Sequence, residues 1–292
     1  MSKVLVTGAS GFIGKALVRR LLLEQYEVVA LSTSDGDIAS PSTLLKYSDE
    51  RFERVFHLAG RSYVPDSWVD PTTFYGTNVL GTANVVEYCR IIGASLTFVS
   101  AYIYGEPEVS PVSEDSSIRP SNPYALSKYL AENVCAFHAE QFGVPTVVIR
   151  PFNVFGVGQS KLFLIPSLIE QALFSTEIVV RDLRPKRDYV YIDDLVDAIM
   201  KASSSHGTYR VYNVGAGASI SVKEIIDIVQ QEARSSKPVI CTEVARRNEI
   251  LDVVSDISRA RSDLGWCPSI PFSQGIRNIV QAEISSCADP KR

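Results

Sequence analysis

Three glycines near the start of the chain stand where a backbone could wrap a charged group. Gly8, Gly11 and Gly14 are spaced GxxGxxG, between an apolar run at 3–6 and apolar residues at helical spacing over 15–23. A strand, a glycine-rich turn and a helix in this order expose backbone N–H groups at the helix start, which hold a phosphate together with the helix dipole. The arrangement favours a dinucleotide site over a plain tight turn.

A phenol and an amine occur later in the chain, one helical turn apart. Tyr124 and Lys128 fall on one face of a helix expected to run to about residue 141. A free phenol has a pKa of about 10, so it is a poor acid–base group at neutral pH. The Lys128 ammonium, with the positive ring of an oxidised nicotinamide, would favour the phenolate.

The Tyr–Lys spacing alone is more typical of a protein surface than of a functional site. A serine earlier in the chain strengthens the functional interpretation of the pair. Ser100 ends an apolar strand before the Tyr124 helix, and its hydroxyl could bind and orient a reacting oxygen. In a chain that opens with a dinucleotide loop, this order of serine, tyrosine and lysine favours a functional role for the pair.

Strands and helices that could position these residues alternate along the first half of the chain. Apolar runs at 3–6, 27–31, 54–58, 96–100 and 146–150 indicate buried strands, with helical patterns between them. The alternation predicts an α/β fold built on a Rossmann doubly wound parallel sheet. His57 lies inside one of these runs, so we expect a hydrogen-bonded core residue and not a ligand.

The remaining segments carry weaker signals. We expect a loop over 61–70, because it contains Pro65, and one helix over 73–89. A strand over 187–194 should lead into a helix at 195–202, and a capping box at Ser221 and Glu224 should start another helix.

The end of the second strand bears on which dinucleotide is bound. Folds that prefer NAD usually carry an acid about 20 residues after the glycine loop, bonded to the adenosine ribose. Here Ser32 and two further hydroxyl residues follow the strand, and Asp35 is the first acid. Hydroxyls can hold a 2′-phosphate, so the sequence favours NADP(H). NAD(H) stays open, since Asp35 could reach back to the ribose.

Composition limits the possible partners. The chain has 292 residues, 46% hydrophobic, with a formal net charge of -4. Nothing suggests a surface for nucleic acid or an anionic membrane, and no apolar run approaches the ~20 residues of a membrane helix. Five cysteines without a CxxC pair predict reduced thiols and no metal site. With no signal-peptide pattern at the N-terminus, we expect a cytoplasmic protein.

Eight stretches together resemble the extended (atypical) short-chain dehydrogenase/reductases, the NAD-dependent epimerase/dehydratase family, in its nucleotide-sugar branch. They are TGASGFIG, FHLAG, SAYIYG, NPYALSK, RPFNVFG, RDYVYIDDL, YNVGAG and RRNEI, and they cover nearly the whole chain. The resemblance implies a cofactor domain and a smaller C-terminal α/β domain, with the sugar between them. We place the Rossmann domain at 1–155 plus about 187–212, and the nucleotide-sugar domain at about 156–186 and 213–285.

The resemblance also implies residue roles. Ser100, Tyr124 and Lys128 match the catalytic residues, and Ser100 and Asn153 match substrate contacts. Arg187 and Arg246 match arginines that grip the substrate diphosphate, although Arg247 stands beside the second. The implied cofactor-binding positions are Gly8, Ser10, Gly11, Phe12, Ile13, Gly14, Ser32, Asp37, Ile38, Leu58, Ala59, Gly60, Tyr124, Lys128 and Pro151. The family further suggests a homodimer.

Two reactions and one non-catalytic role fit these motifs. Ala101 and Tyr102 stand where the family's 4,6-dehydratases carry an Asp–Glu pair, which argues against dehydration. The compressed segment 34–48 and the stretch HLAGRSYVPDSW look most like the GDP-4-keto-6-deoxymannose reductase group. We therefore expect reduction of a 4-keto-6-deoxy nucleotide sugar. A 4-epimerase that retains NAD is the alternative, and a non-catalytic dinucleotide-binding regulator is a minor one.

Overall fold

A six-stranded parallel sheet forms the centre of the computed structural model, which describes residues 2–205, 207–244 and 250–288. Its strands are β1 (Lys3–Thr7), β2 (Glu27–Leu31), β3 (Arg54–His57), β4 (Ser95–Val99), β5 (Thr146–Pro151) and β9 (Tyr209–Val214). They lie in the order β2-β1-β3-β4-β5-β9. The predicted Rossmann sheet is confirmed, and the chain reverses its direction of travel between β1 and β3.

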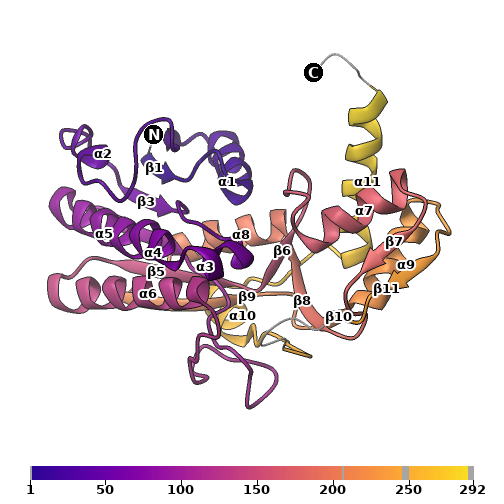
Figure 1. The fold of residues 1–292 in the computed structure, drawn as a ribbon. Coiled ribbons are helices and arrows are strands. Elements are labelled where there is room, and N and C mark those ends of the chain that lie inside the picture. Colours follow the sequence, from indigo (N-terminus) through magenta and orange to yellow (C-terminus); the bar gives the residue numbers. More distant parts are fainter. Residues whose placement is uncertain (1, 206, 245–249, 289–292) are drawn as a thin grey trace.

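Helices cover both faces of this sheet (Figure 1). On one face lie α1 (Phe12–Leu23) and α8 (Ile192–Ser203), and on the other lie α5 (Gly81–Ile92) and α6 (Pro123–Phe142). Each face has its own core: Leu17 and Leu195 belong to one cluster, and Val85 and Ala131 to the other. In the strand order, β2 forms one edge of the sheet. The short α2 (Ser42–Leu45) is the only helix between β2 and β3 in the described chain.

The segment after β3 differs from the prediction. The expected loop over 61–70 contains a helix, α3 (Val64–Val69), because Pro65 occupies the first turn, where its missing N–H costs nothing. The single helix expected over 73–89 is instead α4 (Pro71–Phe74), the π-helical turn η1 (Tyr75–Leu80) and then α5.

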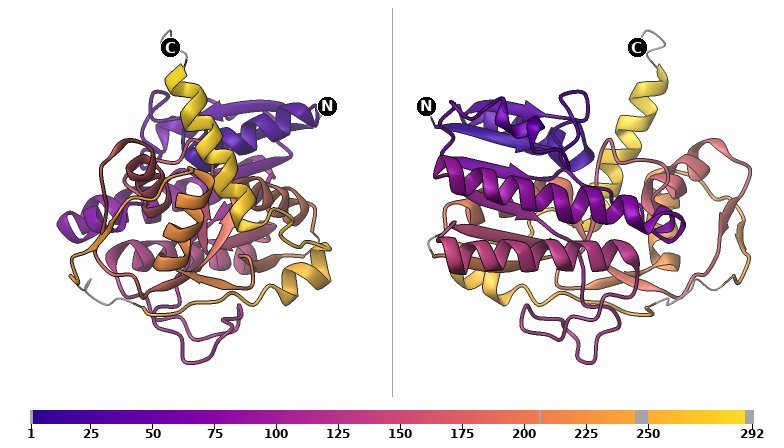
Figure 2. Two further views of the ribbon diagram at one scale, coloured as in Figure 1. Left: turned by 90° about the vertical axis from the view of Figure 1, so that its right-hand side faces the viewer. Right: turned by 60° about the vertical axis from the view of Figure 1, so that its left-hand side comes forward.

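Smaller sheets make up the rest of the molecule. One joins β6 (Asn153–Phe155), β8 (Lys186–Tyr191) and β10 (Ser219–Ser221), and the other pairs β7 (Ile178–Val180) with β11 (Val239–Cys241). Near them lie α7 (Leu164–Phe174), α9 (Val222–Glu232) and α11 (Phe272–Ala288), whereas α10 (Ser258–Leu264) packs against α8 and β9 of the large sheet. The predicted capping box at Ser221 and Glu224 starts α9. Figure 2 shows α11 projecting from the body toward the C-terminus.

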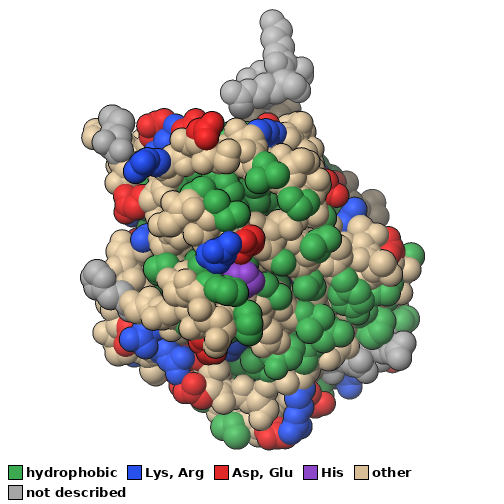
Figure 3. Space-filling model, turned by 90° about the vertical axis from the view of Figure 1, so that its left-hand side faces the viewer, with side chains coloured by type: hydrophobic (Ala, Val, Ile, Leu, Met, Phe, Trp, Pro, Cys, Tyr) green, Lys and Arg blue, Asp and Glu red, His purple; other side chains and the backbone are tan. Residues whose placement is uncertain are grey.

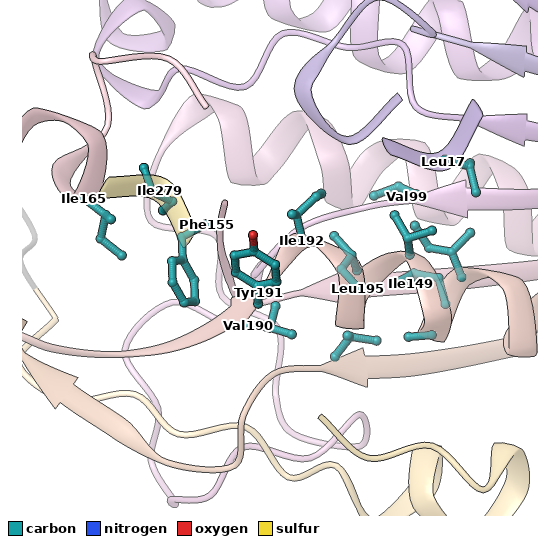
Figure 4. Close-up of a cluster of buried hydrophobic side chains, with 14 of the residues drawn as sticks. Leu17, Val99, Ile149, Phe155, Ile165, Val190, Tyr191, Ile192, Leu195 and Ile279 are labelled. Atoms are coloured by element: carbon teal, nitrogen blue, oxygen red, sulfur yellow. The ribbon is translucent and has the colours of Figure 1, made fainter. Parts of the chain in front are cut away.

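One hydrophobic core joins the large sheet to these smaller elements (Figure 4). It runs from Leu17 and Val99 past Tyr191 and Phe155 to Ile279 of α11. Across the described ranges, no helix is both long and apolar enough to cross a membrane.

Candidate active site

The carboxyl ends of the parallel strands bring most of the predicted cofactor and catalytic residues to one edge of the sheet. The glycine loop follows β1, the turn 58–60 follows β3, Ser100 follows β4 and Pro151 ends β5. In open α/β sheets, ligands bind at this edge, where the strand order reverses. Here the reversal lies between β1 and β3, beside the glycine loop.

The glycine loop is packed too tightly for any other residue type at two positions. Gly8 has a φ of +71°, and a Cβ there would lie 2.6 Å from the amide nitrogen of Ala59. A Cβ on Gly14 would lie 2.1 Å from the carbonyl oxygen of Gly8. The loop therefore touches the turn after β3, and α1 begins at Phe12 with no side-chain cap on its first N–H groups. These donors suit a pyrophosphate.

The Lys128 ammonium group is anchored at the end of β4. Its Nζ donates to the carbonyl of Val99 at 2.8 Å and lies 4.4 Å from the centre of the Phe98 ring. A Cβ on Gly60 would lie 3.9 Å from the same Nζ, so the ammonium is close to the turn after β3. Burial lowers the pKa of Lys128 to about 8.

Ser100 presents a hydroxyl that lacks a protein partner. Its backbone N–H donates to Ile149 of β5 at 2.8 Å, and the side chain is buried. Among the described residues, its Oγ is one of four buried side-chain atoms without a hydrogen bond. A buried hydroxyl without a partner costs about 1–3 kcal/mol, and a substrate oxygen would remove that cost.

Tyr124 lies in the first turn of α6. The helix starts with Asn122 as N-cap, whose Oδ1 accepts from the Ala125 N–H at 2.8 Å, and with Pro123 in the first turn. The Tyr124 ring meets Phe74 edge to face at 6.3 Å. Burial raises the pKa of Tyr124 to about 12. Burial therefore keeps the phenol protonated at neutral pH. The preference for the phenolate concerns the site with an oxidised nicotinamide bound and stays a prediction.

A chain of buried hydrogen bonds connects the glycine-loop strand with the catalytic helix. His57 bonds Thr7 of β1 at 2.7 Å and Thr82 of α5 at 3.0 Å, which confirms it as a hydrogen-bonded core residue. Thr82 donates to the carbonyl of Asn78, and the Asn78 amide donates to Ser127, beside Lys128.

Asn78 is a site residue that the sequence reading passed over. Its side chain also holds the backbone of Arg61 from both sides, through 2.8 and 3.1 Å bonds. It therefore fixes the turn after β3 against α6. The only indication in the sequence was a polar residue within an apolar helical pattern. The spacing of apolar residues does not predict the π-helical turn that points Asn78 inward.

The end of β2 holds both a carboxylate and an ammonium. Asp35 accepts from the Ser32 N–H at 2.8 Å and from the Ser32 hydroxyl at 3.0 Å, and these bonds lower its pKa. Ser34 bonds the same hydroxyl. The Lys46 ammonium, from beyond α2, reaches the Asp35 carbonyl at 2.5 Å. Sequence spacing gave no indication of Lys46.

The other predicted cofactor positions follow the same edge. Asp37 accepts from the Ala39 N–H, and Ile38 is buried against Gly81 of α5. Ser10 and Gly11 are exposed in the loop, and Pro151 is buried at the end of β5. The positions within the first turn of α1 and in the turn after β3 are Phe12, Ile13, Gly14, Leu58, Ala59 and Gly60.

The predicted substrate residues lie on β6 and β8. The Asn153 amide donates to the carbonyl of Asp188 at 3.0 Å. Arg187 is half-buried, and its Nη1 donates to the carbonyls of Lys186 and Ile250. Arg246 lies outside the described residues.

These features together fit a dinucleotide. The uncapped start of α1 offers donors to phosphates, and the glycine loop is exposed at Ser10 and Gly11. Ser100 follows β4, and Tyr124 and Lys128 lie in the first two turns of α6. In the described part of the chain, no three His, Cys, Asp or Glu side chains are grouped to hold a metal.

The fold and this site define a dinucleotide-dependent oxidoreductase of the Rossmann class. The chain belongs to the NAD dependent epimerase/dehydratase family, which matches residues 4–215. It is an enzyme of the extended short-chain dehydrogenase/reductase group, in a branch whose named members are nucleotide-sugar reductases and epimerases.

Relatives of both kinds are about equally similar. The chain is 31% identical to a GDP-6-deoxy-D-mannose reductase from Pseudomonas aeruginosa, over 95% of this chain and 96% of that one. It is also 31% identical to a putative UDP-glucose 4-epimerase from Methanocaldococcus jannaschii, over 95% and 97%.

Solved structures divide in the same way. A UDP-glucose 4-epimerase from Thermotoga maritima with UDP-glucose has a TM-score of 0.93 at 27% identity, covering 98% of this chain and 99% of that one. RMD from Pseudomonas aeruginosa complexed with NADPH has a TM-score of 0.90 at 29% identity, covering 98% and 100%.

Proposed function

We propose that this enzyme reduces the 4-keto group of a nucleotide-diphosphate hexose, with a 4-keto-6-deoxy hexose as the favoured substrate. The observation that carries the proposal is the placement of Ser100 and Lys128: the Ser100 Oγ has no protein partner among the described residues, and the Lys128 ammonium donates to the carbonyl of Val99, directly before Ser100. Tyr124 lies one helical turn before Lys128 on α6, and burial keeps its phenol protonated, with a pKa of about 12. A ketone oxygen that gains negative charge needs such a proton donor.

Each residue has a task in this reaction. A bound reduced nicotinamide supplies the hydride to carbon 4. Ser100, whose Oγ has no protein partner among the described residues, binds and orients the ketone oxygen. Tyr124 donates its proton to that oxygen, and the Lys128 ammonium stabilises the phenolate that remains. Arg187 and Arg246 hold the diphosphate, and Asn153 contacts the sugar.

A 4-epimerase with retained NAD is the second candidate, and Asp35 favours it. A carboxylate at the end of β2 suits a ribose 2′-hydroxyl and repels a 2′-phosphate. Asp35 is fixed there by two bonds to Ser32. Such an enzyme would oxidise and then re-reduce the same carbon, with Tyr124 acting as base and then as acid.

NADP(H) remains the favoured cofactor of the reductase, with Lys46 as its structural support. The ammonium lies at the end of β2 beside three hydroxyl side chains and could pair with a 2′-phosphate. Asp35→Asn should then tighten NADPH binding relative to NADH, and Lys46→Ala should weaken it. Cofactor fluorescence titrations of both variants test the assignment. An unchanged affinity ratio in both would exclude this subsite.

Cofactor turnover separates the two reactions. The first step is a thermal-shift screen of NAD, NADP and their reduced forms with UDP, GDP, dTDP and CDP, since bound ligands raise the melting temperature by mass action. The enzyme is then given the matching 4-keto sugar. A reductase oxidises one NADPH per sugar reduced. An epimerase copurifies with NAD, interconverts the 4-hydroxyl epimers and shows no net change in the cofactor.

The predicted domains and the homodimer belong to the same proposal. The Rossmann domain would comprise 1–155 plus about 187–212, and the nucleotide-sugar domain about 156–186 and 213–285. The large sheet supports the first domain, since its strands lie within 3–151 and 209–214, whereas β6 and β8, at the edges of these ranges, pair with each other outside that sheet. For the dimer, α6 offers an apolar stripe, with Leu126, Leu130 and Phe137 exposed at 36%, 39% and 55%. Beside it lies a shallow hollow of 380 Å³, lined mainly by apolar side chains of η1 and α6.

A further inference from the structure

We propose that Asp188 is a positioning residue for the diphosphate end of the substrate. It is the second residue of the motif RDYVYIDDL, directly after Arg187, and lies on β8 with a fully buried side chain. Successive strand residues point to opposite faces, so the two side chains work on opposite sides of β8. The inference rests on the proposed function, because that proposal gives Arg187 its ligand.

The Asp188 carboxylate joins three separate chain segments. Its Oδ1 accepts from the Ala216 N–H at 2.5 Å, and its Oδ2 accepts from the Gly217 N–H at 3.0 Å. Oδ2 also accepts from the N–H and the hydroxyl of Ser255, at 2.9 and 2.5 Å. A buried carboxylate is costly unless such donors surround it. β8, the turn after β9 and the segment at Ser255 are thus held at one point.

The turn after β9 is shaped to meet this carboxylate. A Cβ on Gly215 would lie 2.3 Å from the Ser255 Oγ and 2.9 Å from each Asp188 oxygen. Only glycine brings the turn this close. The contact also gives a structural reason for the motif YNVGAG, to which no role in the reaction is assigned.

Both substrate side chains depend on the backbone that Asp188 fixes. Asn153 donates to the Asp188 carbonyl at 3.0 Å, and the Arg187 Nη1 donates to the carbonyl of Ile250. The Lys186 N–H donates to the carbonyl of Leu251 at 2.7 Å, which ties the segment before Ser255 to the same strand. Across the described residues, no hydrogen bond joins the glycine loop or the end of β2 to this cluster, so the dinucleotide site should not depend on it.

The test measures the two ligands separately on the full chain. Asp188→Asn and Ser255→Ala are compared with Arg187→Met and with Asp182→Asn, a control whose carboxylate accepts from Arg184 near the surface. The readouts are the Kd of UDP, GDP, dTDP and CDP by calorimetry and the Kd of NADH and NADPH by fluorescence. Hydrogen exchange at 250–257 reports the anchoring directly.

We expect Asp188→Asn to weaken the preferred nucleoside diphosphate about tenfold or more, and Ser255→Ala by about threefold to tenfold. The dinucleotide Kd should stay within about twofold, exchange at 250–257 should rise, and Asp182→Asn should match the wild type. Ser255→Ala decides the matter if Asp188→Asn does not fold.

If Asp188→Asn and Ser255→Ala weaken the binding of the nucleoside diphosphate and of the dinucleotide equally, or weaken neither, Asp188 is not a positioning residue. If Arg187→Met weakens the diphosphate but neither Asp188→Asn nor Ser255→Ala does, the inference fails and the proposed function stands. If the wild type binds none of the four diphosphates, the proposed function fails first and takes this inference with it.

Discussion

Tyr124 is the residue on which the proposed proton transfer depends, and substitution by phenylalanine removes only its hydroxyl group. Tyr124→Phe keeps the ring that meets Phe74 edge to face at 6.3 Å, so the start of α6 should keep its packing. We expect turnover to fall by about 10²–10⁴, the contribution of a positioned acid, while cofactor affinity stays within about twofold. Steady-state assays and fluorescence titration measure both. A variant with a near-normal rate would show that another group supplies the proton.

Lys128 sets a limit on the alkaline side of the pH profile. Its pKa of about 8 means that the ammonium is charged at neutral pH and loses its charge as the pH rises through 8. Since the charge stabilises the phenolate, kcat/KM should fall above about pH 8. Profiles between pH 6 and 10 should show this limb in the wild type and in Lys161→Met, a surface control. Activity that stays constant to pH 9.5 contradicts the assignment.

His57 connects three elements, and its neutrality makes that connection sensitive to acid. Burial lowers its pKa to about 3, whereas the unfolded chain has about 6.5. Below pH 6.5 His57 binds a proton in the unfolded chain but not in the folded chain. The contribution of neutral His57 to the free energy of unfolding is therefore complete above pH 6.5 and is lost as the pH falls toward 3. At pH 5 the loss is about 2 kcal/mol, from about 1.5 pH units.

Urea denaturation at pH 7 and pH 5 tests this contribution. His57→Gln can still bond Thr7 and Thr82 but has no proton to gain, so its drop in unfolding free energy between the two pH values should be about 2 kcal/mol smaller than in the wild type. His138→Gln is the comparison, since the half-buried His138 ring bonds the Val134 carbonyl within α6, lies 3.8 Å from Glu87 and takes no part in the His57 connection. Equal drops in the wild type and His57→Gln would mean that His57 does not carry the effect.

Element by element, the sequence predicted what depends on local patterns. The first five strands of the large sheet, the glycine turn and the capping box at Ser221 follow from apolar spacing and cap chemistry. The helix α3 was missed because Pro65 suggested a loop, although proline fits a first turn. The π-helical turn at Asn78 was missed because its cause is tertiary: the amide bonds Ser127, 49 residues away.

The site divides in the same way. Ser100, Tyr124 and Lys128 could be named from their order along alternating strands and helices. Lys46 and Asp188 could not, because their partners are set by how distant segments meet. The raised pKa of Tyr124 was also beyond the sequence, since the depth of burial, and not the Lys128 spacing, decides its direction.

At the scale of the whole molecule, the face formed by η1, α5 and α6 exposes several large apolar side chains. Figure 3 shows hydrophobic side chains gathered on the side where α5 and α6 end. Leu80 of η1 is 51% exposed, and its neighbour Val79 lines the same hollow as Leu130 and Phe137 of the α6 stripe. Exposed apolar patches of this kind mark interaction surfaces. A second copy of the chain would pair the same patch with itself around a twofold axis.

Phe137→Glu should therefore break the proposed dimer. A stable interface buries about 800 Å² on each partner and depends on a few large apolar residues near its centre. Placing a carboxylate there should raise the dimer Kd by at least about 30-fold, equivalent to about 2 kcal/mol. The control is Phe174→Glu on α7, since both phenylalanines are 55% exposed and lie on helices. Light scattering across a concentration series measures the mass. A wild type that stays monomeric at high concentration, or a Phe137→Glu dimer as tight as the wild type, would remove this face from the assembly.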